Sequence, residues 1–249
     1  MEPFTIQVTE RESVSALLYA APKAKRAGIT LVLGHGAGGN QLSGFMRLFA
    51  SGLADRGLDS VTFNFLYSEQ GRSGPDPKLR LESCYQAVID AVVRHRKLSG
   101  NRLVIGGKSM GGRIASQVAA AWSEKAEVKH EETRTKKTAK DKVETRTPPD
   151  FAGLVFLGYP LHPPGKPEQL RDKHLKDVHA PMLFVQGTRD AFGTPDELKA
   201  IIKRLKPAAT LYLIDGGDHS FKVPKSIGIS QEQVYESTMD EIARWSGAN

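Results

Sequence analysis

The sequence has few of the features that would indicate a disulfide-stabilised or membrane-spanning protein. Cys84 is the one cysteine among 249 residues, which excludes an internal disulfide, and it lies on the apolar stripe of a predicted helix, as expected of a buried structural cysteine. The longest apolar runs fall far short of the roughly 20 residues that a helix needs to cross a bilayer. The segment from Met1 to Phe4 is neither basic nor apolar, so we expect no secretory signal, no membrane association and a cytoplasmic location.

The charge distribution gives no sign of a nucleic-acid or metal site. The net charge is +7, but the basic residues are scattered among acidic ones and no nucleic-acid-binding motif accompanies them. Histidine, cysteine and aspartate residues with metal-ligand spacing are also missing from the sequence. We therefore expect no nucleic-acid partner, no metal and no cofactor.

The composition and the order of predicted elements indicate one α/β domain over residues 1–249. Hydrophobic residues make up 39% and charged residues 25% of the chain, as is typical of a globular domain. Apolar and alternating segments predict strands at residues 4–8, 14–19, 29–33, 59–66, 103–106, 151–157, 182–186 and 210–214. From residue 45 onward, segments with apolar residues at helical spacing alternate with these strands. This order predicts a three-layer α/β fold with a mostly parallel sheet and an N-terminal antiparallel hairpin.

A serine flanked by glycines follows the predicted strand at 103–106. The pattern Gly107-x-Ser109-x-Gly111 is typical of a nucleophile elbow, a sharp strand-to-helix turn in which glycines keep Cβ atoms away from a strained backbone. The amide of Met110 then begins a helix, where it has no intrahelical partner and can face a developing oxyanion. The pattern is common by chance, and a glycine-rich turn with an unreactive serine is the alternative; the strand-turn-helix context favours the elbow.

The polar residues that could assist Ser109 follow other predicted strands. Ligands of parallel sheets bind outside the carboxyl ends of the strands, so these residues should meet at one rim. We predict that His219 is the general base and that Asp190 orients it, in the chain order Ser, Asp, His. Asp196 or Glu197 could take the place of Asp190, and His219 could instead be a loop histidine bonded to nearby backbone.

A second glycine-rich segment, from His35 to Gly39, follows the predicted strand at 29–33. A backbone amide of Ala37 or Gly38 could supply a second oxyanion donor beside Met110, and we take Ala37 as the candidate. The segment lacks the Gly-Lys-Ser/Thr ending of a phosphate-binding loop and the spacing of a dinucleotide fingerprint. Nucleotide binding is therefore not expected.

Two loops at the same rim are expected to line the substrate pocket. One is the long proline-rich loop after the strand at 151–157, and the other follows the strand at 59–66. A surface loop stiffened by its prolines is the alternative for the first. The expected substrate-binding residues are Leu66, Tyr67, Tyr159, Leu161 and His162.

Residues 123–150 form a charged segment with no aromatic and almost no large aliphatic residue. Such a segment cannot build a core of its own, so we predict a charged insertion at the rim opposite the active site. It could be a mobile insertion or a docking arm for a protein partner.

The combined motifs resemble the α/β-hydrolase superfamily over nearly the whole chain. The matching residues are His35-Gly36-Ala37-Gly38, Gly107-Lys108-Ser109-Met110-Gly111-Gly112, Asp190 and His219. The segments Phe63 to Tyr67, Gly158 to Lys166 and Gly187 to Asp190 resemble the dienelactone-hydrolase-like branch, and within it the group that includes the testis-expressed hydrolase-like proteins and a subunit of a nuclear histone-acetyltransferase complex. Dienelactone hydrolases proper carry cysteine where this chain has Ser109, so their substrate should not be transferred.

The sequence thus leads to two hypotheses about function. The first is a serine hydrolase that cleaves a carboxylic ester, or a thioester or other acyl bond of a small-molecule substrate, through an acyl-enzyme intermediate. The second is a non-catalytic interaction module on an α/β-hydrolase scaffold, since fold does not fix function.

Overall fold

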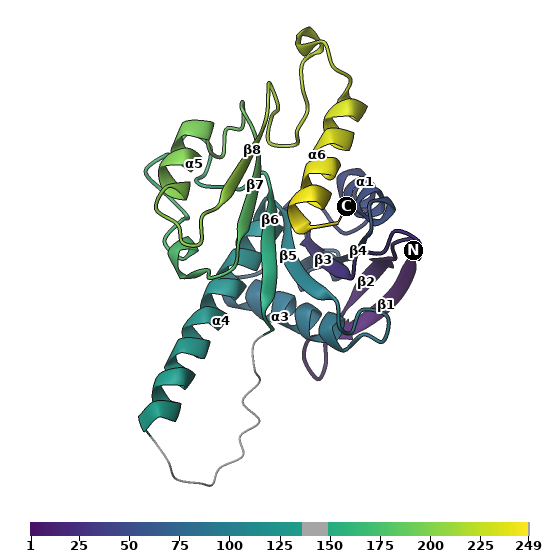
Figure 1. Ribbon diagram of the computed structural model, residues 1–249, viewed down its shortest axis with the longest axis vertical. Helices are drawn as coiled ribbons and strands as arrows, with labels where there is room; N and C mark the ends of the chain where they lie inside the picture. The colour runs from purple at the N-terminus through teal and green to yellow at the C-terminus, as the bar shows by residue number, and fades with distance from the viewer. Residues whose placement is uncertain (136–148, 249) are drawn as a thin grey trace.

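The computed structural model describes residues 1–135 and 149–248, without the side chains of residues 124–135. Within these residues the chain forms an eight-stranded sheet in the order β1-β2-β4-β3-β5-β6-β7-β8 (Figure 1). The strands are β1 (Glu2–Gln7), β2 (Ser13–Tyr19), β3 (Ile29–Gly34), β4 (Leu58–Phe63), β5 (Arg102–Lys108), β6 (Phe151–Leu157), β7 (Met182–Gly187) and β8 (Thr210–Ile214). The helices are α1 (Gly44–Asp55), α2 (Leu66–Glu69), α3 (Lys78–Arg94), α4 (Met110–Thr135), α5 (Pro195–Ile202) and α6 (Gln231–Ser246), with 3-10 turns η1 (Leu175–Asp177) and η2 (Lys225–Ile227).

The sheet has the mixed topology that the sequence predicts. Strand β1 pairs with β2 and β2 pairs with β4 in antiparallel fashion, and all other neighbours are parallel. The prediction of a mostly parallel sheet with an N-terminal hairpin is confirmed. The predicted strand at 59–66 is too long at its end, because Phe65 donates its amide to the His35 ring rather than to a neighbouring strand, and Leu66 begins α2.

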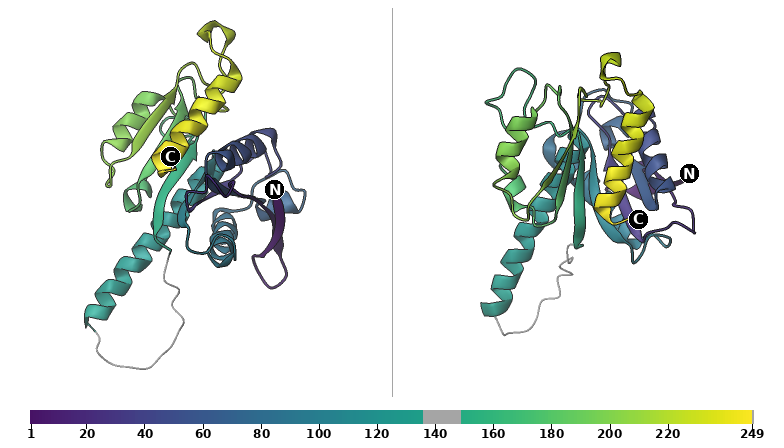
Figure 2. Two further views of the ribbon diagram at one scale, coloured as in Figure 1. Left: turned by 45° about the vertical axis from the view of Figure 1, so that its right-hand side comes forward. Right: turned by 45° about the horizontal axis from the view of Figure 1, so that its top comes forward.

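Helices cover both faces of the sheet, and the strand residues alternate between two cores. In β3, Leu31 and Leu33 pack against apolar residues of α1 and α6, whereas Val32 belongs to the core beneath α3, α4 and α5. Figures 1 and 2 show α1 and α6 on one side of the sheet and α3, α4 and α5 on the opposite side. The uninterrupted apolar strands of the sequence reflect this burial on both faces.

The start of two helices is encoded locally. Thr194 and Glu197 form a reciprocal capping box before α5, and Ser230 and Gln233 form another before α6. Each box satisfies two of the amides that a helix start leaves without partners. Capping therefore fixes where the chain leaves the loops that follow β7 and β8.

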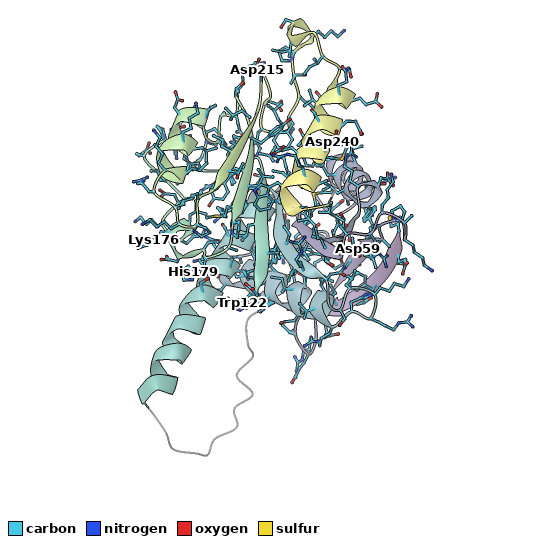
Figure 3. All side chains as sticks on the ribbon, viewed as in Figure 1. Asp59, Trp122, Lys176, His179, Asp215 and Asp240 are labelled. Atoms are coloured by element: carbon cyan, nitrogen blue, oxygen red, sulfur yellow. The ribbon has the colours of Figure 1, made fainter. Side chains whose placement is uncertain are left out.

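The carboxyl ends of the strands and the far end of α4 lie at opposite rims. Asp215, which follows β8, lies at the top of Figure 3, and Trp122 of α4 lies near the other end, where its ring stacks on Phe151 at the start of β6 with 5.5 Å between centroids. Helix α4 continues past the sheet and protrudes from it (Figure 1).

The predicted charged insertion at 123–150 is therefore not a loop in its first part. Its residues up to Thr135 continue α4, because they contain alanine, glutamate and lysine and neither proline nor glycine. Residues 136–148 lie outside the described residues, and the docking of a partner through 123–150 stays a prediction. No helix among the residues that the structure describes is long and apolar enough to span a membrane.

Strands β5 and β6 approach each other closely at Gly106. A Cβ atom added there would overlap the Val155 carbonyl oxygen and press on the Val155 carbonyl carbon at 2.8 Å. The neighbour is backbone inside a sheet, so it cannot yield in the way a side-chain tip can. The position therefore requires glycine.

We expect Gly106→Ala to lower the free energy of unfolding by at least about 3 kcal/mol, or roughly 6 °C or more in Tm. Gly74→Ala is the matched control, because no heavy atom lies within 4 Å of its added Cβ, and its Tm should stay close to that of the wild type. Thermal unfolding followed by circular dichroism measures both. Equal stability of the two variants would contradict the close approach of β5 and β6.

Candidate active site

Ser109 lies in a strained turn between β5 and α4. Its φ of 50° is in the left-handed region, which is uncommon for a residue with a side chain. Gly107 precedes it with φ 148°, and Cβ atoms added at Gly107 or Gly111 would overlap the backbone of Gly34 in β3. The glycines of the predicted elbow are therefore needed because three backbone segments meet there.

The structure brings Ser109, His219 and Asp190 together in one chain of hydrogen bonds. The Ser109 Oγ lies 2.8 Å from the His219 Nε2, and the His219 Nδ1 lies 2.7 Å from an oxygen of Asp190. Asp190 accepts a hydrogen bond from the Nδ1–H group, which leaves Nε2 unprotonated and able to accept a hydrogen bond from the serine hydroxyl. The three residues follow β5, β7 and β8, as the rim argument predicts.

A tight turn presents His219 to the elbow. The carboxylate of Asp218 accepts hydrogen bonds from the amides of Ser220 and Lys222, at 2.7 and 2.9 Å, and these bonds stabilise the turn. Phe221 has φ 63°, and its ring is buried against Phe45 and Phe49. Burial of this ring anchors the turn and offsets the strain of its backbone.

Asp190 has its own set of partners, which sequence reasoning did not find. Gln186 of β7 donates its amide to the Asp190 oxygen that faces His219, at 2.8 Å, and the Phe192 amide donates to the other oxygen, also at 2.8 Å. The carboxylate is fully buried, so these bonds and His219 satisfy a group that water cannot reach. The two alternative candidates for the triad acid have other partners. Asp196 pairs with Lys199, and Glu197 accepts from Thr194 and lies near His162.

Phe192 also limits the movement of His219. Its ring lies over the imidazole with 4.2 Å between centroids and 30° between planes. A bulky aromatic two residues after the acid is the one signal in the sequence that could have pointed to this contact. Together with Asp190 it fixes the orientation of the His219 ring.

Lys108, which directly precedes Ser109, stabilises the turn that carries His219. Its ammonium group donates to the His219 carbonyl and lies 5.6 Å from the ring centroids of Phe45 and Phe221. Burial lowers the pKa of Lys108 to about 8, against the opposing effect of Asp190 and Asp218. The elbow pattern allows any residue at this position, so no sequence signal points to Lys108.

The two predicted oxyanion donors are the backbone amides of Met110 and Ala37, and both residues line the space beside Ser109. Among the described residues, no backbone carbonyl accepts from the amide of Met110 or from that of Ala37. The loop of Ala37 lies against the elbow, because a Cβ added at Gly36 would be 3.6 Å from the Ser109 Cβ. Neither predicted oxyanion donor is therefore paired with backbone, and the loop that carries Ala37 lies close to Ser109.

His35 fixes the peptide plane that carries one of these donors. Its Nε2 accepts the Phe65 amide at 3.2 Å, so the proton sits on Nδ1, which donates to the Gly36 carbonyl at 2.8 Å. The Gly36 carbonyl and the Ala37 N–H belong to the same planar peptide unit and point in opposite directions. The hydrogen bond from His35 to the carbonyl therefore also sets the direction of the N–H. Burial lowers the pKa of His35, which keeps the ring neutral for this role. Tyr67 holds the next carbonyl, that of Ala37, at 2.9 Å.

A cavity of about 810 Å³ opens beside Ser109 and His219, and none of the five expected substrate-binding residues is among those that line it. Leu66, Tyr67, Tyr159, Leu161 and His162 are all buried. From the same loop, Pro160 and Arg171 line the cavity instead. The prediction placed the bulky side chains of the two loops at the surface of the pocket. In the structure they are packed in the interior instead, because burying an apolar side chain stabilises the fold more than leaving it exposed at a pocket surface.

Two further residues carry chemistry without belonging to the hydrogen-bonded chain. Cys84 is buried, and burial raises the pKa of its thiol to about 12, as a structural cysteine requires. His174 is half-buried, with its Nε2 2.8 Å from the Ser116 hydroxyl. Its position in a connecting segment gave no signal for this burial. Within residues 1–135 and 149–248, no group of three or more His, Cys, Asp or Glu residues could hold a metal ion.

A strand-turn-helix elbow at the carboxyl ends of a mixed eight-stranded sheet, with polar loops after the later strands, defines the α/β-hydrolase fold. Comparison with known families agrees, because residues 27–247 match the model of the alpha/beta hydrolase domain family. The chain belongs to this family.

Several solved structures share this fold. A serine hydrolase homologue from Coxiella burnetii matches with a TM-score of 0.68 and 18% identity, over 98% of this chain and 96% of that chain. A serine hydrolase without a lid from Xanthomonas campestris matches with a TM-score of 0.68 and 18% identity, over 100% and 96%. Dienelactone hydrolase from Anabaena variabilis matches with a TM-score of 0.66 and 18% identity, over 96% and 94%. At these identities the likeness establishes the fold alone.

We expect His174→Gln to reduce the loss of stability in acid. Burial, and then Arg113 and Lys78, lower the pKa of His174 from 6.5 to about 4, so the folded protein binds its proton only near pH 4 while the unfolded chain binds one near 6.5. Unfolding therefore takes up a proton between these values, and stability falls as the pH decreases through this window. The variant removes that contribution.

The measurement is urea denaturation of both proteins at pH 7.0 and pH 4.5. The decrease in the free energy of unfolding should be smaller for His174→Gln, and the two proteins should show the same dependence between pH 7 and 9. Parallel losses in acid would show that His174 is not protonated differently in the folded and unfolded states.

Proposed function

We propose that the protein is a serine hydrolase that cleaves carboxylic esters, or thioesters or other acyl bonds, by an acyl-enzyme mechanism. The observation that carries the proposal is the hydrogen-bonded chain from Ser109 through His219 to Asp190, which ends at a cavity with two unpaired amides. The serine hydrolases among the proteins of similar fold agree with this chemistry. A serine hydroxyl needs such a base and an oriented partner to act near neutral pH.

In the first half of the reaction, the Ser109 Oγ attacks the acyl carbonyl carbon while the His219 Nε2 takes its proton. Asp190 accepts the Nδ1 hydrogen bond and stabilises the imidazolium that forms. The amides of Met110 and Ala37 donate to the oxyanion. Collapse of the tetrahedral intermediate expels the alcohol or thiol, which receives the proton from His219.

In the second half, water takes the place of the leaving group. His219 removes a proton from the water, which attacks the acyl-Ser109 carbonyl, and the same two amides hold the second oxyanion. Expulsion of Ser109 returns the proton from His219 to its Oγ. The charged state of His219 is stabilised in both halves by a carboxylate that is fully buried and bonded to Gln186.

The second hypothesis, a non-catalytic interaction module, would suit the narrower resemblance to the testis-expressed hydrolase-like group and its complex subunit. A module of this kind has no need for a strained serine, an oriented imidazole and a buried acid in one hydrogen-bonded chain. Backbone strain is retained where the surrounding structure supports it, and it is common at active sites. The enzyme is therefore the proposal that the geometry supports better.

We expect Ser109→Ala to lose labelling by a fluorophosphonate probe and to lower the hydrolysis of p-nitrophenyl esters by about 10,000-fold or more, because no other group can form the acyl-enzyme. Cys84→Ala is the control and should keep both labelling and turnover, since its thiol is buried and protonated. The assay uses a panel of p-nitrophenyl esters of increasing chain length. Labelling of the Ser109→Ala protein would refute Ser109 as the nucleophile.

Two variants of His35 separate its two hydrogen bonds. An Asn side chain can place its amide N–H near the position of Nδ1, whereas a Gln side chain reaches the position of Nε2 and loses the bond to the Gly36 carbonyl. We expect His35→Gln to lower kcat by about 10- to 100-fold with little change in KM, because a misdirected Ala37 amide no longer stabilises the oxyanion. His35→Asn should stay within several-fold of the wild type.

Stopped or continuous ester assays and a thermal melt of each variant provide the comparison. Equal kcat values for two folded variants would mean that the Gly36 carbonyl does not need His35 for its orientation.

A further inference from the structure

The wall of the cavity carries far more positive than negative charge. Its cationic side chains are Lys78, Lys108, Arg113, Arg171 and Lys222, and its one carboxylate is Asp76. Asp76 is already bound by Arg72 at 2.6 Å and by Arg80 at 3.4 Å, neither of which lines the cavity. It therefore does little to neutralise the cations of the wall.

Arg113 and Arg171 are the two guanidinium groups among these cations, and neither has a carboxylate partner within the described residues. In the part of the chain that the structure describes, neither forms an ion pair, and the Arg113 Nε is buried without a hydrogen-bond partner. The two guanidinium groups also repel each other, and burial together with Arg171 lowers the pKa of Arg113. Of the three lysines, Lys78 pairs with Glu82 at 3.5 Å and Lys108 donates to the His219 carbonyl, whereas Lys222 forms no ion pair with a described residue.

The groups around Arg113 do not supply the missing negative charge. His174 stays neutral because its pKa is lowered to about 4, and burial raises the pKa of Tyr159 so that its phenol stays protonated. Glu82 is the carboxylate whose charge acts on the pKa of Arg113, and it forms an ion pair with Lys78. Keeping a guanidinium partly buried without a counter-charge costs free energy, which a bound anion would recover.

Both arginines line the same cavity as Ser109, and contacts of their backbone hold each of them in place. The Arg113 amide donates to the Ser109 carbonyl at 3.1 Å, so Arg113 lies one helical turn beyond the elbow. The Arg171 backbone is fixed on both sides, since its carbonyl accepts from the Tyr159 hydroxyl at 2.9 Å and its amide donates to the Leu161 carbonyl at 2.8 Å. Tyr159 and Leu161 do not line the cavity, but they position Arg171 through these two hydrogen bonds.

We propose that Arg113 and Arg171 bind a carboxylate of the substrate, so that the hydrolase acts on acyl compounds that carry a second, anionic group a short distance from the bond that is cleaved. The planar fork of a guanidinium group matches a carboxylate in bidentate geometry, and two such forks facing one cavity can hold it from two sides. The inference rests on the proposed function, and it narrows the substrate class of the same site.

The first experiment compares esters that differ only in charge. Mono-p-nitrophenyl succinate, glutarate and adipate carry a free carboxylate at increasing distance, and their p-nitrophenyl methyl diesters are the neutral counterparts. A second pair, 4-acetoxybenzoate and its methyl ester, places the carboxylate on the leaving group. We expect kcat/KM to favour the anionic member of one pair by about 10- to 100-fold, as charged hydrogen bonds of this kind allow.

Variants then connect this preference to the two arginines. Arg113→Met and Arg171→Met should each lose most of the preference and change the neutral esters by less than about 3-fold, whereas Arg113→Lys should keep part of it because the charge remains without the fork. Lys199→Met removes an exposed positive charge outside the cavity and should keep the full preference. This control separates binding in the cavity from general attraction of anions to a basic protein.

A binding measurement works without turnover. Glutarate should bind the wild type and Lys199→Met in isothermal titration calorimetry and raise their Tm, and it should fail to do so with Arg171→Met. Phosphate in place of glutarate tests whether the pair prefers a tetrahedral anion, and tighter binding of phosphate would overturn the assignment to a carboxylate.

The outcomes separate this inference from the proposed function. Absence of fluorophosphonate labelling and of all ester hydrolysis would refute the hydrolase, and glutarate binding that depends on Arg171 would still support the carboxylate site. Normal labelling with equal rates for charged and neutral esters, or losses of the same size for both in the arginine variants, would overturn the inference and leave the hydrolase in place.

Discussion

The close contact between the backbone of Gly34 and the glycines on both sides of Ser109 is the constraint on which the site depends. Added Cβ atoms at Gly107 and Gly111 would overlap the same Gly34 carbonyl, so β3, β5 and the start of α4 can meet only without side chains. This contact holds Ser109 at φ 50° and places the loop after β3 beside its hydroxyl. One packing arrangement therefore sets the nucleophile and the second oxyanion donor together.

Around this contact, buried polar groups satisfy one another in a connected network. Gln186 holds Asp190, Asp190 holds His219, and the carbonyl of His219 in turn accepts from Lys108, the neighbour of Ser109. A network of this kind is costly if one member is left unpaired, because the low dielectric of the interior strengthens both the bonds and the penalties. The arginines of the cavity are the exception, and an unpaired cation in such a setting indicates that the missing partner is a ligand.

Much of the fold could be predicted from local pattern. Apolar strands that are buried on both faces, such as Ile29–Gly34, and helices with one apolar stripe are visible in the sequence because burial repeats along the element. The end of β4 was misplaced because Phe65 bonds to a histidine 30 residues away, which no local pattern records. The extension of α4 to Thr135 differs from the predicted loop because charged residues such as glutamate and lysine are also good helix formers, so a high charge content does not distinguish a loop from an exposed helix.

The sequence by itself determined the glycines of the elbow, the order Ser109, Asp190, His219, and the rim on which they meet, because each depends on local backbone chemistry or on the direction of parallel strands. Only the tertiary structure decided which side chains face the cavity. In the loop after β6, Tyr159 and Leu161 are buried in the core while Arg171 lines the wall, because neighbouring loop residues divide between interior and cavity according to how the whole chain packs. Loops lack the fixed period that lets a strand or helix reveal its buried face, so that division cannot be read before the fold is known.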